Sequence, residues 1–550
     1  MKYLNASFLK QLTIDLCAIP SVSGNAKEEN RCAEFILEEL NKTICCTGTL
    51  FTAEIFKCEH DPLERKAVLA LLRAPKATNR TVLLTGHFDV VDTEVCGDLA
   101  QKAFDLETYT EAIKSKDLAK NIRSDLDSNN WIFGRGSNDM KAGLALFIAT
   151  IRELALDPEL NINIAFLAVP DEEANSAGMR GSVRRWSEFI QEERLEVVAA
   201  LTGEPCFWTS ETKNSPAYRP YYTGTTGKIM PLFMTLGAEA HIGCYYEGFS
   251  AALLLAHLVT CIEGHPELIA GQGDNVLTPP ACLSMQTRRS VYSVTLPERA
   301  VTYFNVLTIE KSPDEVLDWC RNMAAMATMN AVDQLSNSAR AYRQKGGIAP
   351  DVKDVGIYTV QNIRSIAEAK LGSGQLQKKE LEFYESQPKD LDARELSIRM
   401  LEHLVMSADV KGPAIIVGFV PPYYPARLNT QKNVNEKRLR LLMEDLTQQA
   451  SQLAGDGAVR LVDVFGGITD LSFLGFDGDR NALDALVKNM PGWGKTYWLP
   501  IDELLSMDVP VANMAGAGRD AHKATERLEL TYSFEIAPKL LLQAIRRLGE

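Results

Sequence analysis

The sequence predicts an α/β protein with a second, smaller α+β domain inserted in it. Between residues 66 and 205, short and nearly continuous apolar strands alternate with helical stretches, as in a sheet covered by helices on both faces. From Lys228 the order changes to β-α-β-β-α-β, which predicts a ferredoxin-like module. A helix after Asn435 leads back to further strands. The simplest architecture is therefore a discontinuous α/β domain that contains the module.

The first domain is predicted from apolar strands at both ends of the chain. Before the module these strands are residues 66–75, 81–91, 161–173 and 197–205, with a helix at residues 140–157. After the module they are VRLVDVF and PVANMAG, which follow the helix EKRLRLLMEDLTQQASQLAG. We therefore assign residues 1–222 and 432–550 to this domain.

The module is assigned to residues 223–431. Its strand-like segments are KIMPLFMTLGA, CLSMQTRR, RAVTYFNVLTIE and PAIIVGFVPPYYP, and its helical segments are FSAALLLAHLVTCIEG and SPDEVLDWCRNMAAMATMNAV. Residues 336–412 interrupt this order, because they are charged, mostly helical and contain the pair Gly346 and Gly347. We interpret them as an additional helical insertion before the last strand of the module.

Composition excludes several classes of protein. The chain has 550 residues and a net charge of −14, and an acidic surface of this kind repels nucleic-acid phosphates. No apolar run approaches the roughly 18 residues of a membrane helix, and Lys10 and Asp15 interrupt the stretch where a signal peptide is uncharged. The 11 cysteines include no CxxC pair, which is typical of a reducing compartment. We expect a cytoplasmic protein that binds neither nucleic acid nor membrane.

Acidic residues and histidines follow the ends of the predicted strands or lie in glycine-rich turns. In an open α/β sheet, sites form beyond the carboxyl ends of the strands, so these side chains are expected to converge. The segments are GHFD with His87 and Asp89, GRGSNDMKAG with Asp139, DEE with Glu172 and Glu173, GEP with Glu204, and AGAGRDAH with His522.

The number and type of these residues suit two metal ions. Two ions about 3.5–4 Å apart need one bridging carboxylate and two further ligands each. That count is met by His87, Asp139, Glu173, Glu204 and His522. Imidazole and carboxylate ligands suit zinc, cobalt or manganese.

Two acids then remain outside the ligand set. Glu172 is free to act as a general base, and Asp89, two residues beyond His87 on the same strand face, is placed to hold that imidazole from behind. Each motif also has a structural explanation: Glu172 as a solvated acid at a strand end, and His522 as a core histidine. The joint order of the motifs favours the metal site.

The motifs IPSVSG, GHFDVV, GRGSNDMKAG, DEE, GEP and the late AH resemble the dinuclear zinc aminoacylase and carboxypeptidase family. That family includes acetylornithine deacetylase, succinyl-diaminopimelate desuccinylase and carboxypeptidase G-type enzymes. The resemblance spans residues from about 8 to 545, except for residues 336–412. The length and the segments GGITDLSFLG and AGAGRDAH are most similar to the long arginine utilisation branch.

The resemblance implies a zinc-peptidase-like catalytic domain, with a central mixed sheet flanked by helices, and a role for each motif residue. Asp139 would bridge two divalent ions, with zinc expected first and cobalt or manganese as alternatives. His87 and Glu204 would complete one site, and Glu173 and His522 the other. Glu172 would take a proton from the attacking water and deliver it to the leaving amine. A cis peptide bond is also implied after Asp139.

The inserted module resembles the lid and dimerisation domain of the same family, which implies a homodimer through the lid. His241, in LGAEAHIG, matches a lid histidine that stabilises the oxyanion, often from the neighbouring subunit; the alternative is a surface histidine on a turn. The chain departs from the family at two places. The family usually has an asparagine before a proline of the lid, and the corresponding segment here, YSVTLPERA, has none. The family usually has Asp-x-Arg on the next lid strand, where the arginine binds a substrate carboxylate, and the corresponding segment here is FNVLT. Recognition of an α-carboxylate is therefore not predicted.

A further glycine-rich stretch is not expected to bind phosphate. NMPGWGKT, residues 489–496, differs from a phosphate-binding loop because Asn489 replaces the first glycine and Pro491 and Trp493 crowd the turn. No clear strand precedes this stretch.

The sequence thus predicts a metal-dependent hydrolase that cleaves an amide bond in an N-acyl amino acid or a short peptide. Similarity to the arginine utilisation branch points to derivatives of arginine or ornithine. The alternative is an inactive family member that serves as a binding or regulatory protein. The differences from the family in the lid segments favour this alternative, whereas the complete set of metal ligands argues against it. In either case residues 336–412 could mediate binding to a protein partner.

Overall fold

The computed structural model divides the chain into two compact units, each described by itself. The residues described are 1–43, 50–208, 217–271, 276–289, 291–389, 391–455 and 459–550. The first unit comprises residues 1–225, 427–476 and 502–550, and the second comprises residues 226–426 and 477–501.

The first unit is built on an eight-stranded sheet with the strand order β1-β2-β5-β3-β6-β18-β8-β17. Strands β5, β3, β6 and β18 run parallel to one another, whereas the pairs β1–β2, β2–β5 and β8–β18 are antiparallel. The sheet is therefore mixed, and the predicted α/β class is confirmed. The strands are β1 (Phe51–Lys57), β2 (Lys66–Leu72), β3 (Arg80–His87), β5 (Asn163–Val169), β6 (Glu196–Thr202), β8 (Arg219–Tyr222), β17 (Val459–Val462) and β18 (Val511–Asn513).

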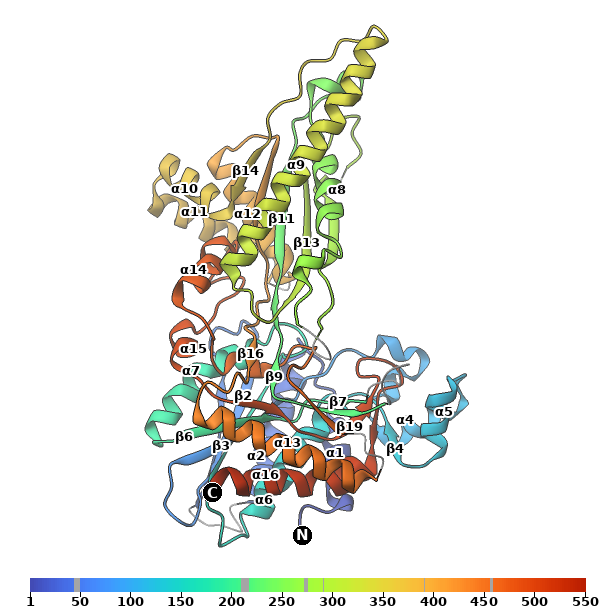
Figure 1. Ribbon diagram of the computed structural model, residues 1–550, viewed down its shortest axis with the longest axis vertical. Helices are drawn as coiled ribbons and strands as arrows, with labels where there is room; N and C mark the ends of the chain where they lie inside the picture. The colour runs from blue at the N-terminus through green and yellow to red at the C-terminus, as the bar shows by residue number, and fades with distance from the viewer. Residues whose placement is uncertain (44–49, 209–216, 272–275, 290, 390, 456–458) are drawn as a thin grey trace. The chain divides into compact units, whose positions relative to one another are not determined.

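Helices cover both faces of this sheet (Figure 1). One apolar core joins Val82 and Leu84 of β3 to five helices. Because side chains alternate along a strand, Leu83 points to the other face, where helix α7 (Ala177–Glu192) packs on β2 and β5 and buries Trp186. The five helices of the first core are α1 (Ala6–Cys17), α2 (Ala26–Asn41), α6 (Lys141–Leu154), α13 (Val434–Ala454) and α16 (Ala537–Gly549).

Shorter elements of the first unit join its distant segments. A small sheet with the order β4-β20-β19-β7 pairs the strand before the glycine-rich turn with strands near the C-terminus. Between β3 and β4 the chain forms four short helices over a separate apolar cluster that contains Tyr109 and Phe133. The elements are η2 (Glu94–Lys102), α4 (Leu106–Ala112), η3 (Ile113–Ser115), α5 (Lys120–Asp127), β4 (Trp131–Phe133), β7 (Cys206–Phe207), β9 (Gly224–Thr225), β16 (Arg427–Leu428), η7 (Asp470–Phe473), α15 (Ile501–Ser506), β19 (Ala517–Arg519), β20 (Arg527–Glu529) and η8 (Tyr532–Ile536).

The second unit has the predicted β-α-β-β-α-β order. Its sheet runs β10-β13-β11-β15-β14, and β12 pairs with β13 on the side away from β11. The strand pairs β11–β13, β11–β15 and β12–β13 are all antiparallel. The elements are β10 (Gly227–Ile229), β11 (Pro231–Leu236), η4 (Ile242–Glu247), α8 (Ala251–Ile262), η5 (Pro266–Leu268), β12 (Ala281–Thr287), β13 (Arg299–Thr308), α9 (Pro313–Gln344) and β15 (Ala414–Phe419).

The region expected to be a helical insertion differs in two respects. Helix α9 continues to Gln344, so the additional segment begins later than predicted. Strand β14 (Gly356–Thr359) then joins the sheet parallel to β15, where only helix was expected. Three helices follow as predicted, and they pack on one core that contains Ile363, Leu376 and Leu401. They are α10 (Val360–Leu371), α11 (Ser373–Glu385) and α12 (Ala393–Ala408).

Residues 477–501 group with the second unit, although the sequence pattern assigns all of 432–550 to the catalytic domain. Helix α14 (Arg480–Asn489) packs on α9, α10 and β15. Its buried face contains Leu483 and Leu486.

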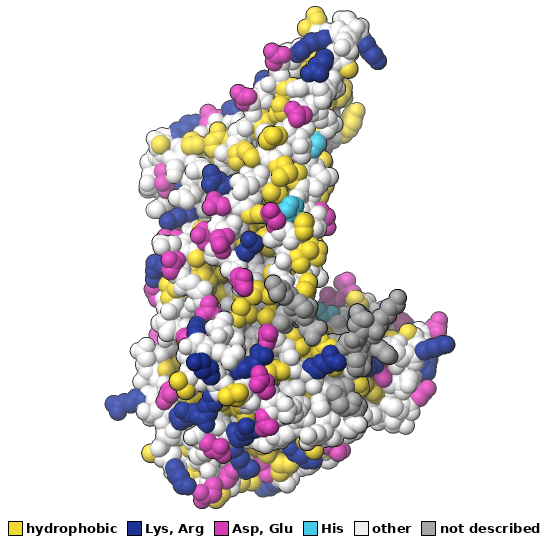
Figure 2. Space-filling view, in the orientation of Figure 1, with side chains coloured by type: hydrophobic (Ala, Val, Ile, Leu, Met, Phe, Trp, Pro, Cys, Tyr) yellow, Lys and Arg dark blue, Asp and Glu magenta, His cyan; other side chains and the backbone are white. Residues whose placement is uncertain are grey.

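Across the described residues, no helix combines the length and the apolar character needed to cross a membrane. Acidic and basic side chains are interspersed over the face drawn in Figure 2.

Candidate metal centre

The residues predicted as metal ligands lie together at one edge of the eight-stranded sheet. His87 is the last residue of β3, the turn after β5 contains Glu172 and Glu173, and Glu204 lies two residues beyond β6. Because β3, β5 and β6 are parallel neighbours, their carboxyl ends meet at this edge.

Asp139 and His522 complete two groups of potential ligands. His87 Nε2 lies 3.2 Å from Asp139 Oδ1 and 3.6 Å from Glu204 Oε1. His522 Nε2 lies 3.3 Å from Asp139 Oδ2 and 2.9 Å from Glu173 Oε2. Within each group of three residues, the ligand atoms are within 4.8 Å of one another. Asp139 belongs to both groups and contributes a different oxygen to each.

The electrostatics of the site suit cations. The pKa of Glu204 is raised to about 7: burial has the largest effect, His87 lowers the pKa, and the carboxylates of Asp139 and Glu173 raise it. Hydrogen bonds to Asp139 and Glu173 raise the pKa of His522 to about 10. Carboxylates this close repel one another unless positive charge lies between them. Two imidazoles and three carboxylates are also a donor set that divalent zinc, cobalt or manganese accepts. The residues therefore fit two divalent ions.

Glu172 lies beside the two groups but belongs to neither. Its Oε2 is 3.9 Å from His87 Nε2, and its side chain is largely buried. Burial raises the pKa of Glu172 well above its ordinary value; His87 lowers it, and Glu204 and Glu173 raise it further. A buried carboxyl group next to the ligand groups is in a position suited to proton transfer.

Asp89 positions two neighbouring segments of the site. The backbone N–H of Glu172 donates to Asp89 Oδ1 at 3.0 Å, and that of Glu173 donates to Oδ2 at 3.2 Å. His87 Nδ1 lies 3.5 Å from Asp89 Oδ1 and 3.0 Å from its carbonyl oxygen. Burial raises the pKa of Asp89, but hydrogen bonds from His87, Ser23 and Glu172 outweigh it and lower that pKa overall. Asp89 thus orients both the imidazole and the turn that contains the two glutamates.

Sequence reasoning missed three residues that support this site. The hydroxyl of Ser23 donates to Asp89 Oδ2 at 2.6 Å, and Ser23 lies in the quoted IPSVSG motif. Glu526 Oε1 accepts the backbone N–H groups of Asn138 at 3.2 Å and Asp139 at 3.3 Å.

The third missed residue, Arg135, connects this support to the last ligand. It forms a buried ion pair with Glu526, and its Nη2 donates to the carbonyl oxygen of His522 at 3.2 Å. The pair therefore holds both the Asp139 turn and the His522 backbone. The available signals were an arginine inside the glycine-rich turn and an acid four residues after His522.

Replacing Glu526 with Gln is expected to weaken metal binding by about 10–100-fold, as for other groups that orient metal ligands. The substitution keeps an oxygen for the Asn138 and Asp139 N–H groups but leaves the buried Arg135 without its carboxylate. Competition with a chromogenic chelator measures the effect, and the exposed Glu535 provides the matched control, Glu535→Gln. Unchanged affinity in Glu526→Gln would show that the pair does not position the ligands.

The lid residues lie in the second unit. His241 is exposed at the start of η4, where its Nδ1 accepts the N–H of Gly243 at 3.1 Å, and its oxyanion role stays a prediction. Arg288 pairs with both Glu395 and Glu402. In the first unit, the peptide bond between Asp139 and Met140 is cis, as the family resemblance implies.

Comparison with known proteins identifies the family of this chain. A sequence model of the peptidase family M20/M25/M40 matches residues 83–478. The chain is 30% identical over 484 residues to YqjN of Bacillus subtilis (strain 168), and this alignment covers 88% of this chain and 86% of YqjN. It is 25% identical over 539 residues to protein RocB of the same organism, and this alignment covers 98% of this chain and 94% of RocB.

A solved structure shares the fold. The M20 family metallo-carboxypeptidase Sso-CP2 of Sulfolobus solfataricus has a TM-score of 0.52 at 12% identity, covering 98% of this chain and 99% of that chain. The family match, together with two potential ligand groups that share Asp139, confirms the predicted resemblance. This chain belongs to peptidase family M20/M25/M40 and is a metallohydrolase.

Proposed function

We propose that this protein hydrolyses an amide bond in an N-acyl amino acid or a short peptide, with the help of two divalent metal ions. The observation that carries the proposal is the position of Asp139, whose two oxygens lie in two separate ligand groups. Glu172 lies next to these groups without belonging to either. A site that only binds metal has no need of such an additional buried acid.

Five residues would hold the ions: Asp139 between the two, His87 and Glu204 on one, and Glu173 and His522 on the other. Bound ions of this kind polarise a carbonyl group and make water more acidic. We expect zinc, with cobalt and manganese as alternatives, because the donor set alone does not select among them.

Glu172 would move the proton. Its carboxylate accepts a proton from the attacking water as the new C–O bond forms, and it delivers that proton to the leaving nitrogen as the C–N bond breaks. Asp89 accepts the backbone N–H of Glu172 at 3.0 Å, which fixes the base against the ligands. Water enters as the nucleophile, and a carboxylic acid and an amine leave.

Two further assignments rest on family resemblance. His241 is exposed and would stabilise the oxyanion, with a homodimer through the second unit. Similarity to the arginine utilisation branch supports derivatives of arginine and ornithine as the first substrates to test, in the cytoplasm.

Metal content and turnover test the proposal together. Elemental mass spectrometry on protein purified without chelator should find close to two ions per chain, and the loaded protein should release amine from N-acetylarginine, N-acetylornithine or a dipeptide. If the protein retains no metal and takes up neither zinc, cobalt nor manganese, the proposal is wrong and a binding or regulatory role is favoured.

A further inference from the structure

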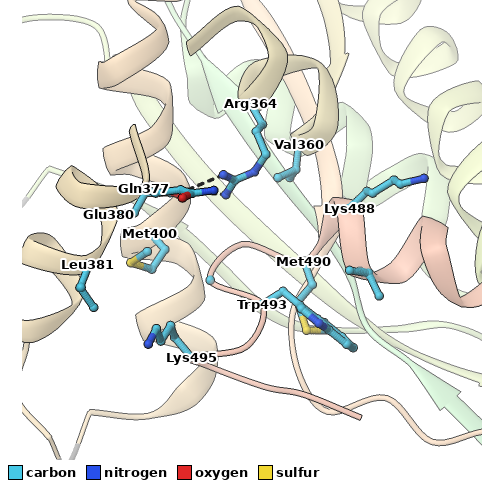
Figure 3. Close-up of a pocket in the computed structure, with 12 residues that line it drawn as sticks. Val360, Arg364, Gln377, Glu380, Leu381, Met400, Lys488, Met490, Trp493 and Lys495 are labelled. Atoms are coloured by element: carbon cyan, nitrogen blue, oxygen red, sulfur yellow. Dashed lines mark hydrogen bonds and ion pairs between the residues drawn. The ribbon is translucent and has the colours of Figure 1, made fainter. Parts of the chain in front are cut away.

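A cavity of about 370 Å³ lies in the second unit (Figure 3), and none of its lining residues belongs to the metal centre. Helices α10, α11 and α12 form one wall. The end of α14 and the loop that follows it form the other. This second wall lies beyond residue 478, where the family match ends. No residue of this lining has a role in the proposed amide hydrolysis.

The floor of the cavity is apolar. Val360, Met400 and Met490 line it and are almost fully buried, and the half-buried Trp493 lies beside Met490 (Figure 3). Methionine side chains adapt to irregular apolar groups, and a tryptophan ring offers a broad flat contact surface. This floor suits a hydrocarbon or aromatic group.

The charged groups of the walls leave a net positive charge. Arg364 and Glu380 neutralise each other through two contacts, Nη1 to Oε2 at 3.0 Å and Nη2 to Oε1 at 2.6 Å. Lys488 lies 3.0 Å from Asp484 of its own helix.

Lys495 is the uncompensated charge. Its Nζ lies 5.7 Å from the centroid of the Tyr384 ring, and it forms no ion pair with any acid among the described residues. An anionic group is therefore the complement that the lining lacks.

The loop that presents Trp493 and Lys495 is held by its own backbone. Gly492 and Gly494 adopt φ values of 74° and 80°, which favour glycine. The N–H groups of Lys495 and Thr496 both donate to the Gly492 carbonyl at 2.8 Å. The N–H of Gly494 donates to the Tyr497 carbonyl at 2.7 Å.

These internal hydrogen bonds have two consequences for a ligand. They fix the conformation of the loop, which reduces the entropy cost of binding. The N–H groups of Gly494, Lys495 and Thr496 are already used within the loop, so they cannot cradle a phosphate, in agreement with the sequence-based exclusion of a phosphate-binding loop.

We propose that this cavity binds a small organic carboxylate whose apolar or aromatic body packs on Met400, Met490 and Trp493 and whose anionic group lies beside Lys495. The volume is at the lower end of the roughly 300–1,000 Å³ typical of small-molecule sites, which suits a compact aryl-alkyl or branched aliphatic acid. No lining residue is a proposed metal ligand, so this site is separate from the one proposed for hydrolysis.

Titration of the full-length protein with 3-phenylpropionate tests the proposal. Calorimetry measures affinity, and tryptophan fluorescence reports contact with Trp493. Two other ligands and two variants define the site. The uncharged 3-phenylpropionamide and inorganic phosphate should both bind at least about tenfold more weakly, because each lacks either the charge or the apolar body. Lys495→Met should weaken binding by about tenfold, the loss of one charge-assisted hydrogen bond. Trp493→Phe should remove the fluorescence response.

Two variants provide controls. Lys379→Ala removes an exposed α11 cation outside the lining and should leave affinity unchanged. Val487→Phe places a larger side chain on the lining and should weaken binding with Lys495 intact.

Four results would overturn the inference: no binding at millimolar concentration, equal binding of the amide, equal binding of phosphate, or full affinity in Lys495→Met. None of them bears on the metal centre, whose metal content and turnover are measured separately.

Discussion

Replacing Glu172 with Gln is expected to lower kcat by about 10²–10⁴-fold or more, while the bound metal stays unchanged. The amide has the size of the carboxylate but cannot accept a proton at neutral pH. The substitution leaves the backbone N–H bond to Asp89 and both ligand groups intact. Steady-state kinetics on an N-acyl amino acid, with metal content determined on the same sample, measures the effect.

Glu188→Gln is the matched control for this variant, since Glu188 is an exposed acid on the helix that follows the same turn. It should retain full activity. If Glu172→Gln also kept full activity with its metal bound, another group would have to move the proton.

Replacing Asp139 with Asn is expected to abolish binding of both ions together. Asp139 Oδ1 lies 3.2 Å from His87 Nε2, and Oδ2 lies 3.3 Å from His522 Nε2, so one carboxylate serves both ligand groups. Glu204→Gln removes a ligand from one group only, and it should leave about one ion per chain. Elemental analysis of the two variants beside the parent protein gives these ratios. Equal losses from both variants would contradict the bridging role of Asp139.

The thermal stability of metal-free Asp139→Asn, compared with that of the metal-free parent, tests whether Asp139 is a metal ligand or a residue that the fold requires. In the metal-free parent, the Asp139 charge raises the pKa of the buried Glu204, which reflects repulsion between the two carboxylates. Asp139→Asn removes that repulsion and also the ion pairs of Asp139 with His87 and His522, which lower the pKa of Asp139. Because these effects oppose each other, the metal-free variant should unfold at nearly the same temperature as the metal-free parent. A large drop in Tm would mean that Asp139 holds the fold itself.

The convergence of the candidate ligands was predictable because each of them lies at a position that local sequence identifies. His87 and Glu204 follow apolar strands directly, and Asp139 lies in a glycine-rich turn before a helix. The sequence gives positions for Arg135 and Glu526 but no sign that they pair, because they lie far apart in the chain and meet only after β4, β20 and β19 have paired.

The fold differed from prediction where short elements depend on distant partners. Strand β14 has four residues and pairs with β15, which begins only after three intervening helices. The assignment of α14 could not be made from sequence either. Leu483 and Leu486 mark a buried helix face, but an apolar face does not reveal which domain covers it.

The split first unit also determines the order in which the protein can be assembled during synthesis. When Thr225 leaves the ribosome, β6 has been made, but β18, the strand that pairs beside it, begins only at Val511. At about 5–20 residues per second, that edge of β6 waits roughly 15–60 s for its partner. Unpaired edges invite association with other chains, so nascent molecules depend on dilution or chaperones during this interval. His522 and Glu526 are synthesised later still, so the metal centre is among the last parts of the enzyme to be completed.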